Sequence, residues 1–137
     1  YLGLDWGKVN IGYSLGDSEL GIAFPSGILQ NSPKIFDDIA TLCRKENVGG
    51  IVLGLPKSLS GTLGPQTQTI EAFARRLKRA VSAPIFFEDE RFTTKIASKI
   101  FGKLKRTHAD AIAASLILQS FFDRQRIVPP PEEEAES

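Results

Sequence analysis

Short apolar runs separated by turn residues make up the first part of the chain. Residues 1–5 (YLGLD) are apolar up to a terminal acid and predict a buried strand. The runs IGYSLGD (11–17) and LGIAFPSGIL (20–29) predict two strands of a hairpin that turns around residues 17–19. Pro25 predicts that the second of these strands bends or lies at a sheet edge, because proline cannot donate a hydrogen bond to a neighbouring strand.

Helical and strand-like segments alternate after this hairpin. A cap-and-proline start precedes apolar positions at helical spacing over residues 33–47, which predict an amphipathic helix. The polar, glycine-rich run SLSGTLGPQTQ (58–68) predicts a loop. The remaining expected elements are a strand over GGIVLGLP (49–56), a helix over TIEAFARRLKRAV (69–81), a strand over APIFFEDE (83–90), a helix from Thr93 to about Phe101, and a long helix from about Thr107 to Arg126.

This order of elements predicts the fold class. Three antiparallel strands that lead into βα units give an α/β domain with a five-stranded mixed sheet, three antiparallel strands followed by two parallel ones, flanked by helices. The 137 residues fit one such domain, which we expect to span residues 1–127. Residues 128–137 (VPPPEEEAES) are proline-rich and acidic and predict a disordered tail.

The composition indicates a general class of protein but does not identify a function. With 42% hydrophobic and 24% charged residues it is typical of a soluble globular protein. The net charge of +1 does not indicate a nucleic-acid binder, although a local basic patch remains compatible with it. A single cysteine cannot form an internal disulfide and favours a reducing, cytoplasmic location. No apolar run reaches the roughly 18 residues of a membrane span, so no membrane association is expected.

Three separate segments place acidic residues at one edge of the predicted sheet. Asp5 ends the first strand, residues 88–90 (EDE) end the last strand, and Asp110 opens the final helix. Ligands of open α/β sheets collect at the carboxyl ends of the parallel strands. Carboxylates that converge without histidine or cysteine suit Mg²⁺ or Mn²⁺. Two such ions would activate a water and stabilise the leaving oxygen of a phosphodiester.

The acidic run at the end of the last strand divides between two faces. Side chains alternate along a strand, so Glu88 and Glu90 share one face while Asp89 and Arg91 point to the other. Glu90 is therefore expected to face the cation, with Glu88 just behind it. Asp89 is expected to have a structural partner on the opposite face.

Each of the three acids also has a structural interpretation. Asp5 could be a turn residue, and Asp110 could cap the helix or interact with its dipole. Glu90 could form a solvated ion pair with Arg91. The arrival of three segments at one edge favours the metal site.

Basic residues near this edge are less specific. Lys57 lies in GLPKSLSGTLG (54–64), which either holds a phosphate or forms a surface turn, because its glycine spacing is not that of a P-loop. The four cations within residues 75–79 are a solvated helix face or a contact to a phosphate backbone. His108 either caps the final helix or shuttles a proton.

Four motifs in order resemble the YqgF/RuvX family, small bacterial RNase H-like proteins named as Holliday-junction resolvases and as pre-16S ribosomal RNA nucleases. The resemblance runs from Leu2 to about Asp123. The motifs are LGLDWGKVNIGYSLGD (2–17), IVLGLPKSLSGTLGPQTQ (51–68), DERFTT (89–94) and DAIAASLILQSFFD (110–123).

The resemblance implies an RNase H-like fold and a catalytic, metal-binding set of Asp5, Glu90 and Asp110. It implies a metal-dependent nuclease that hydrolyses phosphodiester bonds, with Mg²⁺ or Mn²⁺ as cofactor and precursor 16S rRNA as substrate. The residues expected to contact phosphates are Lys57, Arg91, Lys103, Lys105 and Arg106. The alternatives are a Holliday-junction resolvase acting on branched DNA and a non-catalytic nucleic-acid or ribosome-assembly adaptor. The partner is structured RNA or branched DNA, and the protein is a monomer or a homodimer.

Two features depart from the family pattern. Members commonly carry an arginine before the IG of the second strand, where this chain has Asn10 with Lys8 as the nearby cation. The interval from Glu90 to Asp110 is shorter than is usual, and the shortened part is the basic link. Both departures affect the expected grip on the nucleic-acid backbone rather than the metal chemistry.

Overall fold

The computed structural model describes residues 1–55, 65–89 and 106–126. Its elements, in chain order, are β1 (Leu2–Asp5), β2 (Asn10–Asp17), β3 (Ile22–Gln30), α1 (Ile35–Lys45), β4 (Ile51–Leu55), α2 (Pro65–Ala80), β5 (Ile85–Asp89) and α4 (Arg106–Arg126). The helix expected from Thr93 to Phe101 and the tail expected over 128–137 lie outside the described residues.

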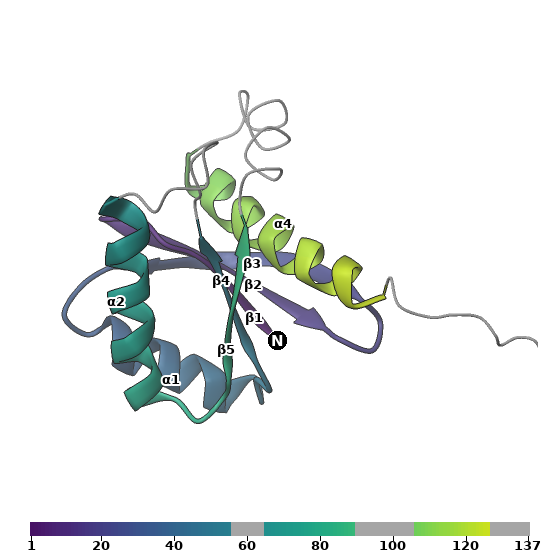
Figure 1. The fold of residues 1–137 in the computed structure, drawn as a ribbon, viewed down its shortest axis with the longest axis horizontal. Coiled ribbons are helices and arrows are strands. Elements are labelled where there is room, and N and C mark those ends of the chain that lie inside the picture. The colour runs from purple at the N-terminus through teal and green to yellow at the C-terminus, as the bar shows by residue number, and fades with distance from the viewer. Residues whose placement is uncertain (56–64, 90–105, 127–137) are drawn as a thin grey trace, which may run out of the picture.

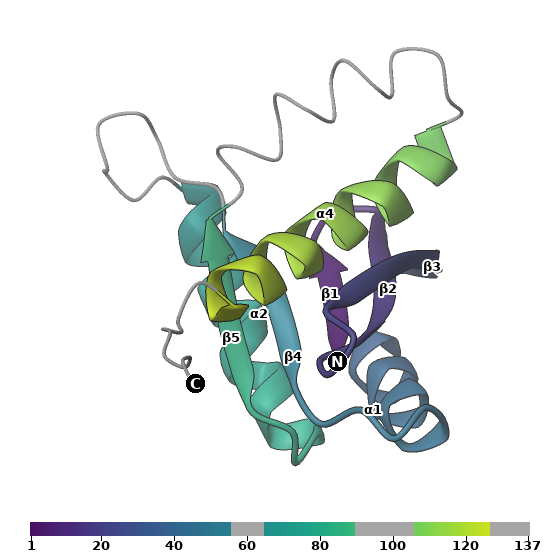
Figure 2. The ribbon, with the colours of Figure 1, turned by 90° about the vertical axis from the view of Figure 1, so that its right-hand side faces the viewer.

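The five strands form one mixed sheet with the order β3-β2-β1-β4-β5. The β1–β2 and β2–β3 pairs are antiparallel, whereas β1–β4 and β4–β5 are parallel. This arrangement confirms the predicted sheet. Helix α4 crosses one face of the sheet, and α1 and α2 lie on the other (Figures 1 and 2).

Large aliphatic side chains form the core on the α1/α2 face. Strands β1, β2 and β4 direct alternate residues to this face, where they meet the apolar sides of the two helices. The side chains that are fully buried there include Leu2, Leu4, Ile11, Ile39, Ile51, Leu53, Ile70 and Leu77. The helical spacing read from the sequence for α1 and α2 therefore marks the buried sides of both helices.

A smaller, more aromatic core lies on the α4 face. Val52 from β4 packs with Ile117, Leu118 and two phenylalanines of α4. The ring of Phe86 on β5 lies 5.2 Å from that of Phe121, centroid to centroid. Strands β4 and β5 are thereby held to the same helix that crosses β1 and β2.

The hairpin of β2 and β3 has the irregular strand at a sheet edge that Pro25 predicts. The register shifts at Tyr13 and Ser14, where Pro25 becomes the partner of Ser14, and β3 is one of the two edge strands of the described sheet. The hydroxyl of Ser26 accepts a hydrogen bond from the Leu15 N–H at 3.1 Å. An edge position with an irregular register is where a strand accommodates proline.

The predicted start of the second helix is wrong by about one turn. Residues 65–68 are predicted to belong to a loop, whereas α2 begins at Pro65. Proline suits the first helical position because its fixed φ is helical and its missing N–H would have no partner there. Thr67 is 2% exposed, so this first turn is packed against the domain despite its polar sequence.

Candidate active site at the carboxyl edge of the sheet

Asp5 is the last residue of β1, and alternation along the strand places it on the α4 face. Leu2 and Leu4 point into the core with α1 and α2. Gly3 faces the other way, because a Cβ added to it would lie 2.8 Å from the carbonyl oxygen of Ala114 in α4. Asp5 follows Gly3 by two residues and therefore shares its face.

Gly12 connects Asp5 to Asp110. In the antiparallel register Gly12 is the direct partner of Asp5. A Cβ on Gly12 would lie 2.0 Å from the carbonyl oxygen of Asp110, closer than any side chain allows. The backbone of Asp110 thus rests on the immediate neighbour of Asp5, and two of the three predicted acids arrive at the same corner of the sheet.

Small residues along β2 hold α4 in this position. The hydroxyl of Ser14 is buried and donates a hydrogen bond of 2.8 Å to the Ala114 carbonyl. A Cβ on Gly16 would lie 2.7 Å from the ring of Phe122. Gly12, Ser14 and Gly16 occupy alternate positions, so one side of β2 offers α4 a close-fitting surface. This alignment was not predicted, although small residues alternate in the sequence GYSLG.

Asp110 lies one turn inside α4 rather than at its start. The helix begins at Arg106, and its first turn contains no acidic residue. The position therefore contradicts the alternative that Asp110 caps the helix or interacts with its amino-terminal dipole. The close contact with β2 is a better account of where this acid is held.

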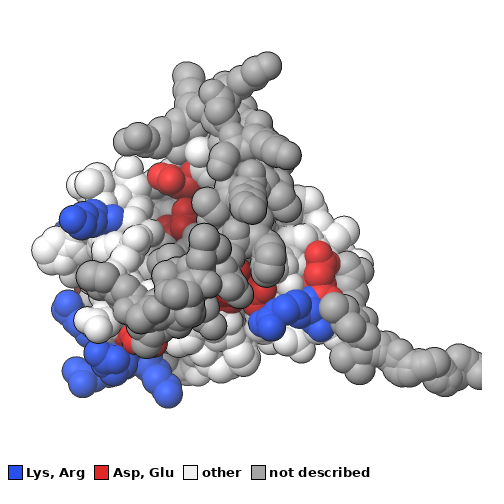
Figure 3. Space-filling model, turned by 45° about the horizontal axis from the view of Figure 1, so that its top comes forward, with Lys and Arg blue, Asp and Glu red and all other residues white. Residues whose placement is uncertain are grey.

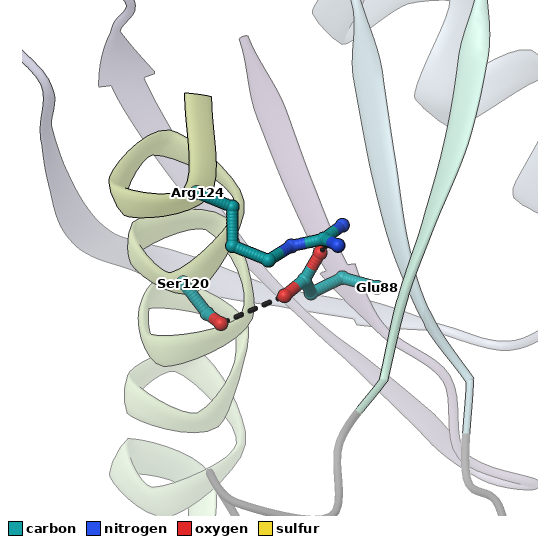
Figure 4. Close-up of polar contacts among 3 residues, drawn as sticks. All are labelled: Glu88, Ser120 and Arg124. Atoms are coloured by element: carbon teal, nitrogen blue, oxygen red, sulfur yellow. Dashed lines mark hydrogen bonds and ion pairs between the residues drawn. The ribbon is translucent and has the colours of Figure 1, made fainter. Parts of the chain in front are cut away.

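Glu88 forms a buried polar contact with α4 (Figure 4). Its side chain is 4% exposed, although it carries a carboxylate. The Ser120 hydroxyl donates to one carboxylate oxygen at 2.7 Å, and the Arg124 guanidinium donates to the other at 2.6 Å. A buried charge needs such partners, and Glu88 is accordingly a link between β5 and α4.

The predicted division of Glu88 and Asp89 between two faces is confirmed. Glu88 contacts α4, whereas Asp89 pairs in register with Leu55, a residue of the core with α1 and α2. Sequence reasoning placed Glu88 behind the cation-facing acid but missed its partners, because Ser120 and Arg124 lie far along the chain.

Several predicted site residues fall outside what the structure describes. Arg106 is the first residue of α4, but its side chain is not among the described ones. Within residues 1–55, 65–89 and 106–126, no three His, Cys, Asp or Glu side chains are grouped closely enough to hold a metal. The predicted residues beyond those ranges are Lys57, Glu90, Arg91, Lys103 and Lys105.

The turn after β1 is tightly built around the candidate site. The Asn31 side-chain amide donates a 2.7 Å hydrogen bond to the Gly7 carbonyl, and a Cβ on Gly7 would lie 2.5 Å from the Asn10 carbonyl oxygen. Trp6 packs against the α1/α2 core, and its indole nitrogen is buried without a hydrogen-bond partner among the described residues. The single tryptophan of the chain therefore follows Asp5 in sequence and packs on the opposite face of the sheet.

Charge is unevenly distributed over this edge. Figure 3 shows acidic surface near the middle of the face that includes the carboxyl ends of the parallel strands, beside segments that are not described. Basic surface lies at the left and lower left of the same view and also right of centre, beside acidic surface. Acidic and basic surface therefore both lie on this side of the molecule.

Comparison with known proteins identifies relatives along nearly the whole chain. The model of the family described as "RuvX: Holliday junction resolvase" matches residues 1–124. A Rickettsia typhi protein named "Putative pre-16S rRNA nuclease" is 40% identical over 126 residues, which cover 86% of this chain and 81% of the relative. Proteins of the same name from Roseiflexus sp. (strain RS-1) and Thermoanaerobacter pseudethanolicus are 37% and 38% identical, covering 91% of this chain and 94% and 96% of theirs.

Solved structures share the fold at low sequence identity. The structure described as T. thermophilus RuvC in complex with Holliday junction substrate has a TM-score of 0.57 and is 12% identical, covering 90% of this chain and 94% of that one. This likeness confirms the predicted RNase H-like fold. Among the described residues no helix is long and apolar enough to cross a membrane.

Proposed function

The chain belongs to the RuvX family and is a nuclease, a hydrolase of phosphodiester bonds, and we propose that its substrate is precursor 16S ribosomal RNA. Proteins that are similar to this chain over most of both lengths are named "Putative pre-16S rRNA nuclease", and these names support this substrate. The observation that carries the site is the contact of the Asp110 backbone with Gly12, the strand partner of Asp5.

The proposed metal ligands are Asp5, Asp110 and Glu90, with Glu90 either binding the ion or orienting the attacking water. Hard carboxylate oxygens suit Mg²⁺ or Mn²⁺, and Asp5 and Asp110 would supply them at one corner of the sheet. When bound, two such ions would lower the pKa of a water and stabilise the charge that develops on the phosphodiester. Glu90 follows Glu88 by two positions, so continued strand alternation would direct it to the same face.

We propose that the basic residues around this edge contact the substrate. Their positive charge would hold the phosphates on either side of the cleaved bond without reading the sequence. They are Lys57, Arg91, Lys103, Lys105 and Arg106. We also propose that the protein acts in the cytoplasm.

A second candidate substrate is branched DNA, which the description of the matching family favours. A resolvase must cut two strands at symmetric positions, so it would act as a dimer with two sites. Solution mass and paired nicks on a symmetric four-way junction would distinguish this activity from RNA cleavage.

The test of the proposal is cleavage of structured precursor rRNA and of four-way DNA junctions by Asp5→Asn with Mg²⁺. We expect the variant to lose at least about a hundredfold in rate, because one ligand of the metal site would lose its charge. Asp37→Asn is the matched control, since Asp37 is exposed in the first turn of α1 on the other face. Equal cleavage by Asp5→Asn and the parent would overturn the site assignment.

A further inference from the structure

A groove lies between α2 and β5, away from the candidate metal site. Its volume is about 420 Å³, and β5 is the outermost strand on that side of the described sheet. Helix α2 contributes Glu71, Arg75 and Lys78 to the lining, and the strand contributes Ile85 and Phe87. We name these five residues the α2–β5 groove. A concave site of this volume takes a small molecule or a short segment of a polymer rather than a duplex.

The helix side of the α2–β5 groove is basic. Arg75 and Lys78 are spaced three residues apart, so they project from the same side of α2. Both are exposed, and neither forms an ion pair in the part of the chain that the structure describes. Glu71, one turn earlier, is the acid among the described lining residues. Two cations against one acid give the groove a net attraction for an anionic partner.

The strand side presents an aromatic ring. Phe87 on β5 is 40% exposed and is one of the large apolar side chains that the sheet presents to solvent. Phe36 offers a contrast, because the guanidinium of Arg76 lies 4.7 Å from its ring centroid. No described ring or cation stacks on Phe87, so its face is open to a partner from solution.

A strand of unpaired nucleotides has the chemistry that these features require. Aromatic rings stack on bases only where the base is not already covered in a duplex, and nearby cations hold the phosphates. An acidic peptide would satisfy Arg75 and Lys78 but would leave Phe87 without a stacking partner. The combination of ring and cations therefore favours single-stranded nucleic acid over an acidic protein segment.

The α2–β5 groove runs along β5 on the α1/α2 face of the sheet, opposite the α4 face on which Asp5 lies. Phe87 stands two residues before Asp89, the last described residue of the strand, which leads to Glu90. We propose that the groove binds an unpaired segment of the RNA substrate that extends beyond the cleavage site, with a base on Phe87 and phosphates on Arg75 and Lys78. This inference rests on the proposed function, since RNA is taken as the substrate.

The test measures binding without cleavage. Fluorescence anisotropy of a labelled oligouridylate of about eight nucleotides, in EDTA, reports affinity for unpaired RNA. We expect Phe87→Ala and Phe87→Leu each to weaken binding by about fivefold or more, because stacking is lost. The Arg75→Ala/Lys78→Ala variant should also weaken binding, with a salt slope lower by about 1.4 for two phosphate contacts.

Arg79→Ala is the matched control, because Arg79 is an exposed cation of α2 outside the α2–β5 groove. Phe87→Leu keeps the apolar contacts of the strand, so it separates lost stacking from lost folding. Groove variants that bind the oligonucleotide no more weakly than Arg79→Ala would overturn the inference. A peptide of residues 128–137 provides a second way to overturn the inference. If that peptide displaced the oligonucleotide, and if Phe87→Ala left the affinity for the peptide unchanged, the groove would bind an acidic segment instead.

The outcomes separate this inference from the proposed function. If the parent cleaves precursor rRNA but the groove variants bind oligouridylate like the parent, the α2–β5 groove assignment fails alone. If the groove variants lose binding while the parent cleaves no RNA, the proposed activity fails and the groove remains a nucleic-acid site.

Discussion

The two faces of the sheet are built in different ways. The α1/α2 face is filled by large aliphatic side chains such as Leu53 and Leu77, both fully buried. The α4 face instead brings helix backbone against Gly12 and binds it through Ser14. Large side chains fill the first face, whereas on the second face the small residues of β2 let α4 approach closely beside its aromatic core. The predicted catalytic acids Asp5 and Asp110 lie on the face that is fixed by close approach.

Leu53→Ala should have the largest effect on stability and leave the candidate site unchanged. A buried leucine truncated to alanine costs about 2–5 kcal/mol, because it leaves a cavity. Leu53 faces the α1/α2 core, so Mn²⁺ affinity should stay like that of the parent. Urea unfolding measures the first effect and metal titration the second. Leu20→Ala, at a position 65% exposed, is the control and should be nearly neutral.

Gly12→Ala should affect both stability and the site. The added Cβ cannot coexist with an oxygen 2.0 Å away, so α4 must shift from β2. We expect a loss of about 1–3 kcal/mol together with weaker Mn²⁺ binding. Gly49→Ala is the matched control, because a Cβ there meets nothing within 4 Å. If Gly12→Ala bound Mn²⁺ like the parent, close approach of α4 would not be what positions the acids.

Arg124→Ala should destabilise the protein by about 1 kcal/mol. It leaves the buried Glu88 carboxylate with the Ser120 hydroxyl but without its cation. The arginine is 60% exposed, so water compensates part of the loss. A double-mutant cycle with Glu88→Gln isolates the interaction, and the double variant should lose less than the sum of the two single variants. Strict additivity would mean that the pair contributes nothing to stability.

The smallest of the expected effects is a change in the alkylation rate of Cys43, which packs on the α1/α2 face. Burial raises the pKa of its thiol, and the charge of Arg44 opposes this only in part. Alkylation by iodoacetamide at about pH 8 should therefore be slower in the folded than in the unfolded protein. The stability that this shift provides is complete below the thiol's ordinary pKa and is lost as pH rises through the raised value. Equal alkylation rates in both states would contradict the assignment.

The sequence predicts the elements well where its pattern is local. The alternation in the first three strands, the spacing of Ile35 and Ile39, and the irregular edge at Pro25 all correspond to the structure. The start of α2 was missed because the polar segment before it gives no apolar period, although Pro65 favours a helix start.

Contacts between distant segments could not be read from the sequence. The acids at the ends of β1 and in α4 were predicted from strand-end logic, whereas the close approach at Gly12 depends on how α4 crosses the sheet. The same holds for Glu88. Burial of its carboxylate is unfavourable without partners, and the structure shows that Ser120 and Arg124 supply them. Periodicity describes one element at a time, and these contacts join two.

The central claim is that Asp5 and Asp110 hold the same metal ion or ion pair. Trp6 is the residue that follows Asp5 in the chain, so we expect a change in its fluorescence during Mn²⁺ titration to report binding without any substrate. We predict that Asp5→Asn and Asp110→Asn each weaken binding strongly and that the double variant is little weaker than either single one. Two independent, additive losses, or parent-like binding by either single variant, would contradict a shared site.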